Sequence, residues 1–391
     1  MPVINSIAAM KDEMTEWRRD IHMHPELGFE EFRTSNLVAE KLESWGVEVH
    51  RGVGQTGVVG VLKGRGASDK SIGLRADMDA LPMQEENDFA YKSKHDGKFH
   101  GCGHDGHTTM LLGAAKYLAE TKNFDGTVHF IFQPAEEGKG GGKAMVDDGL
   151  FDRFASDEVY GMHNWPPLQA GEAGLRPGPM MAAADEFKVT IKATGGHAAM
   201  PHYTVDPVII ATQIVQGFQT LVSRNTNPLH PAVISVTQMH IGSAFNVIAD
   251  DGWMGGTVRT FDEKVQDEIE AGMARIAKSV ADAYGGEAEV FYRRGYPATV
   301  NHEKQAEKAA RVAEAVLGQG KVDRDMQPVM GAEDFSYMLE KRPGAYIAMG
   351  QAGGPSGCMV HNPRYDFNDE ILPIGASWFA TMVETELKRA S

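Results

Sequence analysis

The stretch His100–His107, with the sequence HGCGHDGH, constrains this chain more than any other. Three histidines, a cysteine and an aspartate lie within eight residues, and the intervening glycines let the backbone turn sharply enough to point several donor atoms at one place. A thiolate and an imidazole suit zinc, and together with carboxylates they also suit manganese, nickel or cobalt. The stretch predicts a metal site; the ordinary alternative is a polar glycine loop with solvated histidines.

The composition sets the class of protein. At 391 residues the chain exceeds one comfortable core, so about two domains are expected. With 42% apolar and 24% charged residues it is globular, and a net charge of -16 argues against nucleic acid or an anionic membrane surface as a partner. Two cysteines, Cys102 and Cys358, provide no disulfide framework and favour a reducing compartment. Without a secretion signal or a run of roughly 18 apolar residues, we expect a cytoplasmic protein.

Acidic residues follow an apolar run typical of a buried strand in an α/β sheet. Residues 57–62 and 71–76 are both such runs, and the second continues into Asp77-Met78-Asp79. Ligands of such sheets collect past the carboxyl ends of the strands, and alternate residues share a face if the strand continues. Both carboxylates can bind a metal directly or orient a metal-bound histidine from behind; for Asp79 we favour the second role.

Two further strand ends carry metal-binding residue types. Residues 127–132 lead to Glu136 and Glu137, and residues 158–162 end at His163. Adjacent side chains diverge, so one glutamate can ligate a metal while the other faces a bound water, as hydrolytic metal sites require. A pair of glutamates alone is more often a solvated edge, but the convergence of three strand ends favours one site.

The chain resembles the metal-dependent amidohydrolases that include hippurate hydrolase, plant auxin-conjugate hydrolases and bacterial N-acyl-amino-acid deacylases, which are relatives of aminoacylase. The resemblance spans nearly the whole chain. Its most specific blocks are CGHDGH, PAEEG and HNPRYDFND. The others are DIHMHPELGFEE, LRADMDALPM, GMHNWP, GGHAAMPH, GTVRTFD and GAEDFSYM.

This resemblance implies a dinuclear site for zinc, manganese, nickel or cobalt. Cys102 would bridge both ions, with His104 and His163 on one ion and Glu137 and His361 on the other. Glu136 would be the general base and acid. More distant relatives use a carboxylate as the bridge and begin their metal set with a histidine where Asp77 stands, which leaves the partition of the ligands open.

After residue 184 the pattern changes to alternating apolar and polar residues, typical of a sheet with one solvated face. The predicted elements follow a β-α-β-β-α-β order, the ferredoxin-like arrangement. We therefore expect an α/β fold: a mixed-sheet, zinc-peptidase-like catalytic domain of residues 1–183 and 296–391, with a ferredoxin-like α+β domain of residues 184–295 inserted. The resemblance implies that the insert is a lid and forms the interface of a homodimer or dimer-based tetramer.

The resemblance also assigns roles to three residues of the insert. His197, among small residues, would donate to the carbonyl oxygen of the scissile amide, often from the partner subunit. Arg259 and Asn246 would hold the free carboxylate of the substrate, which a guanidinium can grip with two bonds. Without the resemblance, a lone arginine at a strand end is usually a surface charge.

The predicted function is metal-dependent hydrolysis of N-acyl-L-amino acids to a carboxylic acid and a free amino acid. Alternatives are a dipeptidase or exopeptidase, a deacetylase of N-acetyl-diaminopimelate, or, in another class, a non-catalytic metal- or peptide-binding protein. The sequence leaves the acyl group open, as it does the roles of four residues: His22, His24, Asp77 and Cys358.

Overall fold

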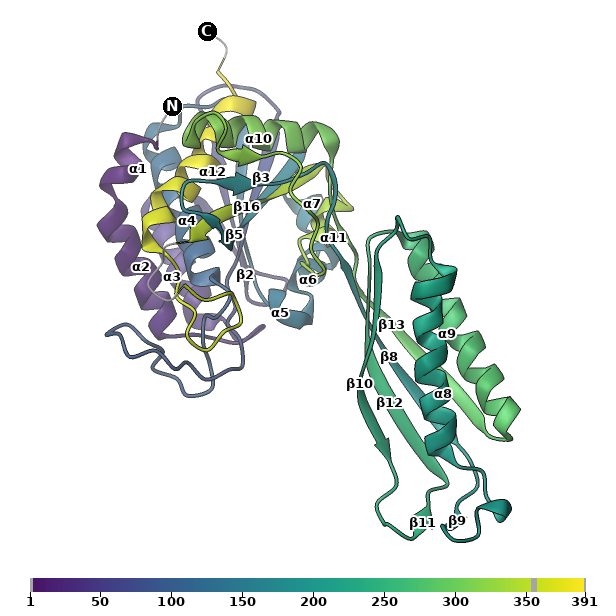
Figure 1. Ribbon diagram of the computed structural model, residues 1–391. Helices are drawn as coiled ribbons and strands as arrows, with labels where there is room; N and C mark the ends of the chain where they lie inside the picture. Colours follow the sequence, from purple (N-terminus) through teal and green to yellow (C-terminus); the bar gives the residue numbers. More distant parts are fainter. Residues whose placement is uncertain (1–2, 353–356, 390–391) are drawn as a thin grey trace. The chain divides into compact units, whose positions relative to one another are not determined.

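The computed structural model describes residues 3–352 and 357–389, which form two compact units (Figure 1). Unit 2 consists of Met181–Thr299 and Pro328–Glu333, and unit 1 contains the rest of the chain. The short segment joins unit 2 because the amide of Ala182 donates to two of its carbonyls, at 3.1 Å and 2.9 Å. The domain roles expected from the sequence stay predictions: a catalytic role for residues 1–183 with 296–391, and a lid role for residues 184–295.

Unit 1 is built on a mixed eight-stranded sheet in the order β1-β2-β4-β3-β5-β16-β6-β15. Its central strands β4, β3, β5 and β16 run parallel, so their carboxyl ends share one edge. β3 is buried along its whole length, which explains its nearly continuous apolar sequence. The strands are β1 (Glu48–Val53), β2 (Gly57–Lys63), β3 (Ser71–Asp77), β4 (Thr127–Gln133), β5 (Glu158–Gln169), β6 (Ala173–Gly174), β15 (Val322–Asp323) and β16 (Gly344–Ala352).

Helices cover both faces of this sheet: α2, α4 and α12 lie on one side and α6, α7 and α11 on the other (Figure 1). The first helical segment of the chain is divided into α1 and α2, because the amide of Met10 donates to the carbonyl of Ile7 at 3.0 Å and so closes a tight turn between them. The helices are α1 (Asn5–Ala9), α2 (Lys11–Met23), α3 (Phe32–Ser44), α4 (His104–Thr121), α5 (Glu136–Lys139), α6 (Gly141–Asp147), α7 (Leu150–Arg153), α10 (Glu303–Leu317), α11 (Ser336–Leu339), α12 (Leu372–Glu386) and the 3-10 turn η3 (Asp369–Ile371).

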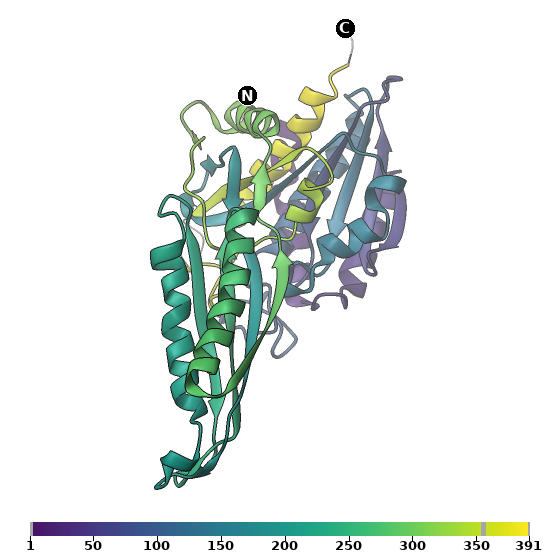
Figure 2. The same cartoon turned by 90° about the vertical axis from the view of Figure 1, so that its right-hand side faces the viewer.

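Unit 2 has the β-α-β-β-α-β order, with α8 and α9 packed on one face of an antiparallel sheet ordered β10-β12-β8-β13 (Figure 2). Alternate residues of β8 are buried against these helices. The elements are β8 (Ala183–Lys192), β9 (Gly196–His197), η1 (Pro201–Tyr203), α8 (Pro207–Thr220), η2 (Leu221–Asn225), β10 (Ala232–Ile241), β11 (Val247–Ile248), β12 (Asp251–Thr260), α9 (Glu263–Tyr284) and β13 (Glu287–Tyr296). A separate pair joins β7 (Gly178–Met181) and β14 (Thr299–Asn301). Among the helices of the described residues, none combines the length and the apolarity of a membrane span.

His22 ties α2 to α4 inside unit 1. It is fully buried, with Nδ1 2.8 Å from an Asp105 oxygen and Nε2 3.2 Å from a Glu85 oxygen. His24 hydrogen-bonds to the carbonyl of Asp20 at 2.8 Å. In the described part of the chain neither histidine belongs to a group of potential metal ligands. The contacts of both histidines are those of structural residues.

We expect His22 to make the stability of the fold depend on pH. Burial opposes its protonation, but the bonds to Asp105 and Glu85 raise its pKa from 6.5 to about 9. The charged histidine therefore stabilises the fold fully below pH 6.5, and this contribution is lost as the pH rises through about 9. The stability gap between wild type and His22→Gln should shrink by on the order of 3 kcal/mol across this window.

Urea unfolding at pH 6, 7.5 and 9 measures this gap. The half-buried His50, paired with Glu48 at 3.0 Å, offers a matched control, because His50→Gln removes a histidine whose carboxylate partner is exposed. A gap for His22→Gln that stayed constant with pH would contradict the charged state assigned to this histidine.

Candidate metal centre

The carboxyl edge of the unit 1 sheet gathers the polar strand ends. In the parallel register Asp77 of β3 is opposite Gln133 of β4, and Arg75 is opposite Gly161 of β5, which places His163 level with Asp77. β3 ends at Asp77, so Asp79 lies beyond the strand, and the shared face considered for the two aspartates does not form. β3 and β4 nevertheless end at one level of the sheet. The strand expected to end at His163 continues instead to Gln169 as β5, because β16 goes on pairing with it, so His163 lies within this strand at that level.

The five residues predicted as ligands lie together at this edge. Ligand atoms of Cys102, His104 and His163 are all within 4.8 Å of one another, and so are those of Cys102, Glu137 and His361. Cys102 belongs to both groups, the position that a bridging ligand requires. Its Sγ is 3.4 Å from His163 Nε2, and Glu137 Oε1 is 3.2 Å from His361 Nε2. Their coordination of metal stays a prediction.

Two of the imidazoles are oriented as metal-bound histidines usually are. His104 Nδ1 donates to the carbonyl of Asp79 at 3.0 Å and lies 3.2 Å from the Asp79 carboxylate. His163 Nδ1 donates to the carbonyl of Asn164 at 2.6 Å. Each ring therefore turns Nε2 toward the cluster, and the buried Nε2 of His104 has no hydrogen-bond partner among the described residues. This arrangement of sulfur, nitrogen and oxygen donors fits a divalent cation.

The protonation of the cluster also fits a site made for cations. Burial, and then the charge of Glu137, raises the pKa of the Cys102 thiol. Bonds to Cys102 and Glu137 raise the pKa of His361 to about 10. Burial opposes protonation of His104, but the carboxylate of Asp77 raises its pKa well above the usual value. Without a cation the cluster therefore retains protons, which a bound cation would displace.

Glu136 and Glu137 are presented by a strained turn after β4. Ala135 has φ 52°, in the left-handed region that non-glycine residues rarely adopt. The next two amides, of Glu136 and Glu137, each donate at 3.0 Å to one oxygen of the Asp79 carboxylate. Glu136 is buried, and one of its oxygens lies within 4.8 Å of ligand atoms of Glu137 and His104. Asp79 thus lies directly behind these three residues, as the role predicted for it requires.

A further polar layer lies behind the ligands, and two of its members, His107 and Asn164, were missed from the sequence. Asp77 and His107 form a group with His104, but their atoms already bind one another. Asp77 accepts from His107 Nδ1 at 2.6 Å and from Arg75 at 2.7 Å, and His107 Nε2 lies 2.7 Å from Asn164 Oδ1. These contacts favour a role for Asp77 behind the ligands, which stays a prediction. The signal for His107 was its spacing of three from His104, which puts both on one helix face.

The predicted substrate-binding residues all lie in unit 2, at two ends of its sheet. His197 of β9 pairs with Val247 of β11, and the amide of Ala198 donates to Asn246 O at 3.1 Å. Arg259 is half-buried on β12 opposite Ala184. The strand β8 runs from that end toward β9, and its stretch from Ala184 to Lys192 alone spans about 27 Å. Within one chain, therefore, Asn246 and Arg259 do not meet, although both were predicted to hold one carboxylate.

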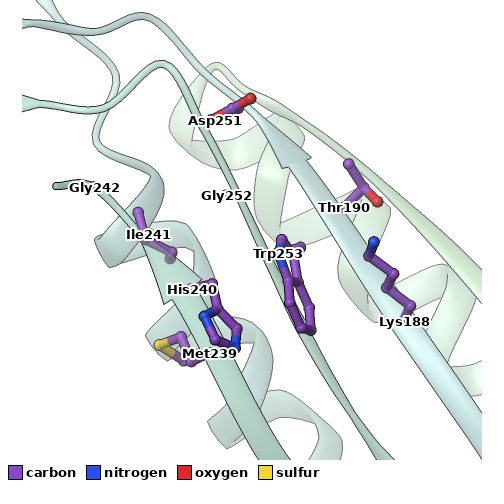
Figure 3. Close-up of a pocket in the computed structure, with 9 residues that line it drawn as sticks. All are labelled: Lys188, Thr190, Met239, His240, Ile241, Gly242, Asp251, Gly252 and Trp253. Atoms are coloured by element: carbon purple, nitrogen blue, oxygen red, sulfur yellow. The ribbon is translucent and has the colours of Figure 1, made fainter.

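The open face of the unit 2 sheet carries two shallow hollows. One contains Trp253, whose ring stacks on His240 at 4.3 Å and lies 4.8 Å below the Lys188 ammonium (Figure 3). The other is lined in part by Arg259 and Asp185. The first hollow contains none of the predicted site residues.

Comparison with known proteins points to one family. The model of peptidase family M20/M25/M40 matches residues 73–385. Hippurate hydrolase of Campylobacter jejuni is 41% identical over 99% of this chain and 100% of its own, and thermostable carboxypeptidase 1 of Saccharolobus solfataricus is 39% identical over 95% of each. The crystal structure of Bacillus subtilis YXEP, described as a dinuclear metal binding peptidase, has a TM-score of 0.86 and 34% identity, covering 98% of this chain and 99% of that one.

The matched family region includes all of the clustered ligands, and the similarity to relatives extends over essentially the whole chain. The chain belongs to the peptidase family M20/M25/M40.

Proposed function

We propose that this enzyme hydrolyses the amide bond of N-acyl-L-amino acids, releasing a carboxylic acid and a free amino acid. The observation that carries the proposal is a sixth group beside five clustered ligands: the buried carboxylate of Glu136, next to Glu137 and His104. A protein that only bound metal or peptide would not require this additional carboxylate. A hydrolase requires it, because water must lose a proton as it attacks and the leaving amine must gain one.

The ligand cluster would hold two divalent cations, of zinc, manganese, nickel or cobalt. Cys102 would bridge them, with His104 and His163 on one side and Glu137 and His361 on the other, in keeping with the two groups that share the thiol. The dinuclear description of the Bacillus subtilis relative supports this number. When bound, such ions lower the pKa of water and polarise a carbonyl.

The chain itself supplies proton transfer and substrate orientation. Glu136 would take a proton from the attacking water and return it to the nitrogen of the leaving amino acid. His197 would donate a hydrogen bond to the oxyanion of the tetrahedral intermediate. Arg259 would grip the free carboxylate of the substrate with two parallel bonds.

The names of the relatives indicate substrates that are cleaved at the same kind of bond. Hippurate is benzoylglycine, and a carboxypeptidase releases an amino acid whose nitrogen is acylated by the rest of a peptide. In both substrates the leaving group is an amino acid with a free carboxylate. A simple acyl group is favoured here because hippurate hydrolase matches the chain over its full length.

Unit 2 would act as a lid and as the interface of a homodimer. His197 and Asn246 lie at the end of its sheet opposite Arg259, at a distance longer than an N-acyl amino acid. We therefore propose that each substrate meets Arg259 from one chain and His197 with Asn246 from the partner subunit.

The first prediction from this proposal concerns Glu136. Glu136→Gln should lower kcat for benzoylglycine by about 10²- to 10⁴-fold, because the proton carrier is lost while the ligands remain. Bound metal, measured by mass spectrometry of the dialysed protein, should be unchanged. Glu137→Gln is the contrasting control, since it should lose metal as well as activity. Normal turnover by Glu136→Gln would exclude this residue as the base.

The second prediction concerns the bridging thiol. Chelation should lower the Tm of the wild type, because a cation that binds only the folded state stabilises it by about 2.7 kcal/mol at 100 times its Kd. Cys102→Ala should bind at most one ion and lose most of this effect. Cys358→Ala, which alters the other cysteine, should retain both ions and the full change in Tm. Equal metal content in the two variants would contradict a bridging role for Cys102.

The third prediction tests the contribution of the partner subunit. His197→Ala and Glu136→Gln should each be nearly inactive, but a mixture refolded together should regain about a quarter of wild-type activity. Half of such dimers would be mixed, and each mixed dimer would contain one intact site. If the mixture stayed as inactive as its components, His197 would have to act within its own chain.

A further inference from the structure

A turn of five residues, Pro134–Gly138, presents the proposed base, and we call it the base turn. Its three successive amides, of Ala135, Glu136 and Glu137, each donate to an oxygen of a buried carboxylate. The second and third bind Asp79, and the first donates to Glu31 Oε1 at 2.8 Å. Two carboxylates from distant segments thus fix the backbone from which Glu136 extends.

The geometry of the base turn needs such support. Ala135 has φ 52°, a conformation that costs a residue other than glycine roughly 1–3 kcal/mol and persists only where its surroundings enforce it. Asp79 binds the two amides after Ala135 but not its own. Glu31 is therefore the group that holds the strained residue itself.

Glu31 is held as firmly as the turn it supports. It is fully buried, and its other oxygen accepts from Thr56 Oγ1 at 2.5 Å. The loop that precedes it also lies against the turn: a Cβ on Gly28 would be only 3.0 Å from the Ala135 Cα and Cβ atoms. Lys139, just after the turn, donates to the carbonyl of Gly28 at 2.8 Å. The segment from Gly28 to Glu31 thus braces one side of the base turn.

We propose that Glu31 is a positioning residue for the reaction: by accepting the amide hydrogen of Ala135, it sets the direction in which the Glu136 carboxylate is presented. This inference rests on the proposed function, since it assigns a purpose to the orientation of Glu136. Glu31 is not a member of either ligand group in the described part of the chain, so it acts through the backbone of the base turn.

Burying the ionisable carboxyl group of Glu31 costs folding free energy, which argues that this group has a specific use. Burial, together with the nearby charge of Asp79, raises its pKa from 4.5 to about 7. A neutral residue would avoid this penalty, but a carboxylate makes a shorter and stronger bond to a backbone amide. The chain thus places a strong acceptor where the strained amide of Ala135 has to be held.

The test compares three variants in the full-length, metal-loaded enzyme. Glu31→Ala removes the acceptor for Ala135, whereas Glu31→Gln retains an oxygen there and removes only the charge. Glu26→Ala is the matched control from the same loop, because the Glu26 carboxylate caps α3 through the amides of Arg33 and Thr34, both at 2.9 Å. In the part of the chain that the structure describes, its carboxylate bonds to α3 and not to the base turn, so this variant reports the general cost of a weakened loop.

We expect Glu31→Ala to lower kcat for benzoylglycine by about 10- to 100-fold, with KM changed less than about 3-fold and two ions still bound. Glu31→Gln should restore kcat to within about 3-fold of wild type, and Glu26→Ala should leave it unchanged. Hydrogen exchange of a peptide spanning residues 133–139 should accelerate in Glu31→Ala only, because the amide of Ala135 loses its acceptor.

Two results would overturn the proposal. One is a kcat of metal-loaded Glu31→Ala within about 2-fold of wild type; the other is an equal loss in Glu31→Ala and Glu26→Ala that follows their loss of folded protein. Failure of the proposed function itself is distinguishable, because Glu136→Gln would then remain active whatever the behaviour of Glu31. An inactive Glu136→Gln beside a fully active Glu31→Ala would reject the positioning role alone.

Discussion

The carboxylate of Asp79 is the interaction on which the site depends most. Its two oxygens accept the amides of Glu136 and Glu137, and one of them also lies against Nδ1 of His104. One side chain thus joins three segments that are far apart in the sequence. It can do so because β3 and β4 are parallel and in register, which ends both strands at the same level of the sheet.

Behind this contact the sheet edge is filled by buried charges rather than by apolar side chains. Arg75 binds both Asp77 and Asp334, and Asp77 in turn holds His107. Removing one member of such a network leaves an unpaired buried charge, which lowers the free energy of unfolding by several kcal/mol. Other arrangements of these side chains are therefore unfavourable. Two of the ligands are therefore preorganised, because Nδ1 of His104 and Nδ1 of His163 each donate to a fixed backbone carbonyl.

The second unit adds a different constraint. A continuous β-strand separates the ends of a sheet rigidly, so His197 and Arg259 cannot be brought onto one small molecule by local adjustment within unit 2. Any reaction that uses both must draw them from two copies of the chain. The length of the strands therefore supports the proposed homodimer, in addition to the resemblance to known amidohydrolases.

The sequence alone indicated which potential ligands gather in one place, two of the three strand ends beside them and the β-α-β-β-α-β order of unit 2. These features follow from local patterns: apolar runs, helical spacing and glycine-rich turns. Only the tertiary structure decided which nitrogen of each histidine faces the cluster and that His22 and His107 support other side chains. It also decided that Asn246 and Arg259 lie apart and that Glu31 accepts the amide of Ala135. Each of these depends on a hydrogen bond or strand pairing between residues distant in the sequence, such as the 104 positions from Glu31 to Ala135, and no local pattern records such a partner.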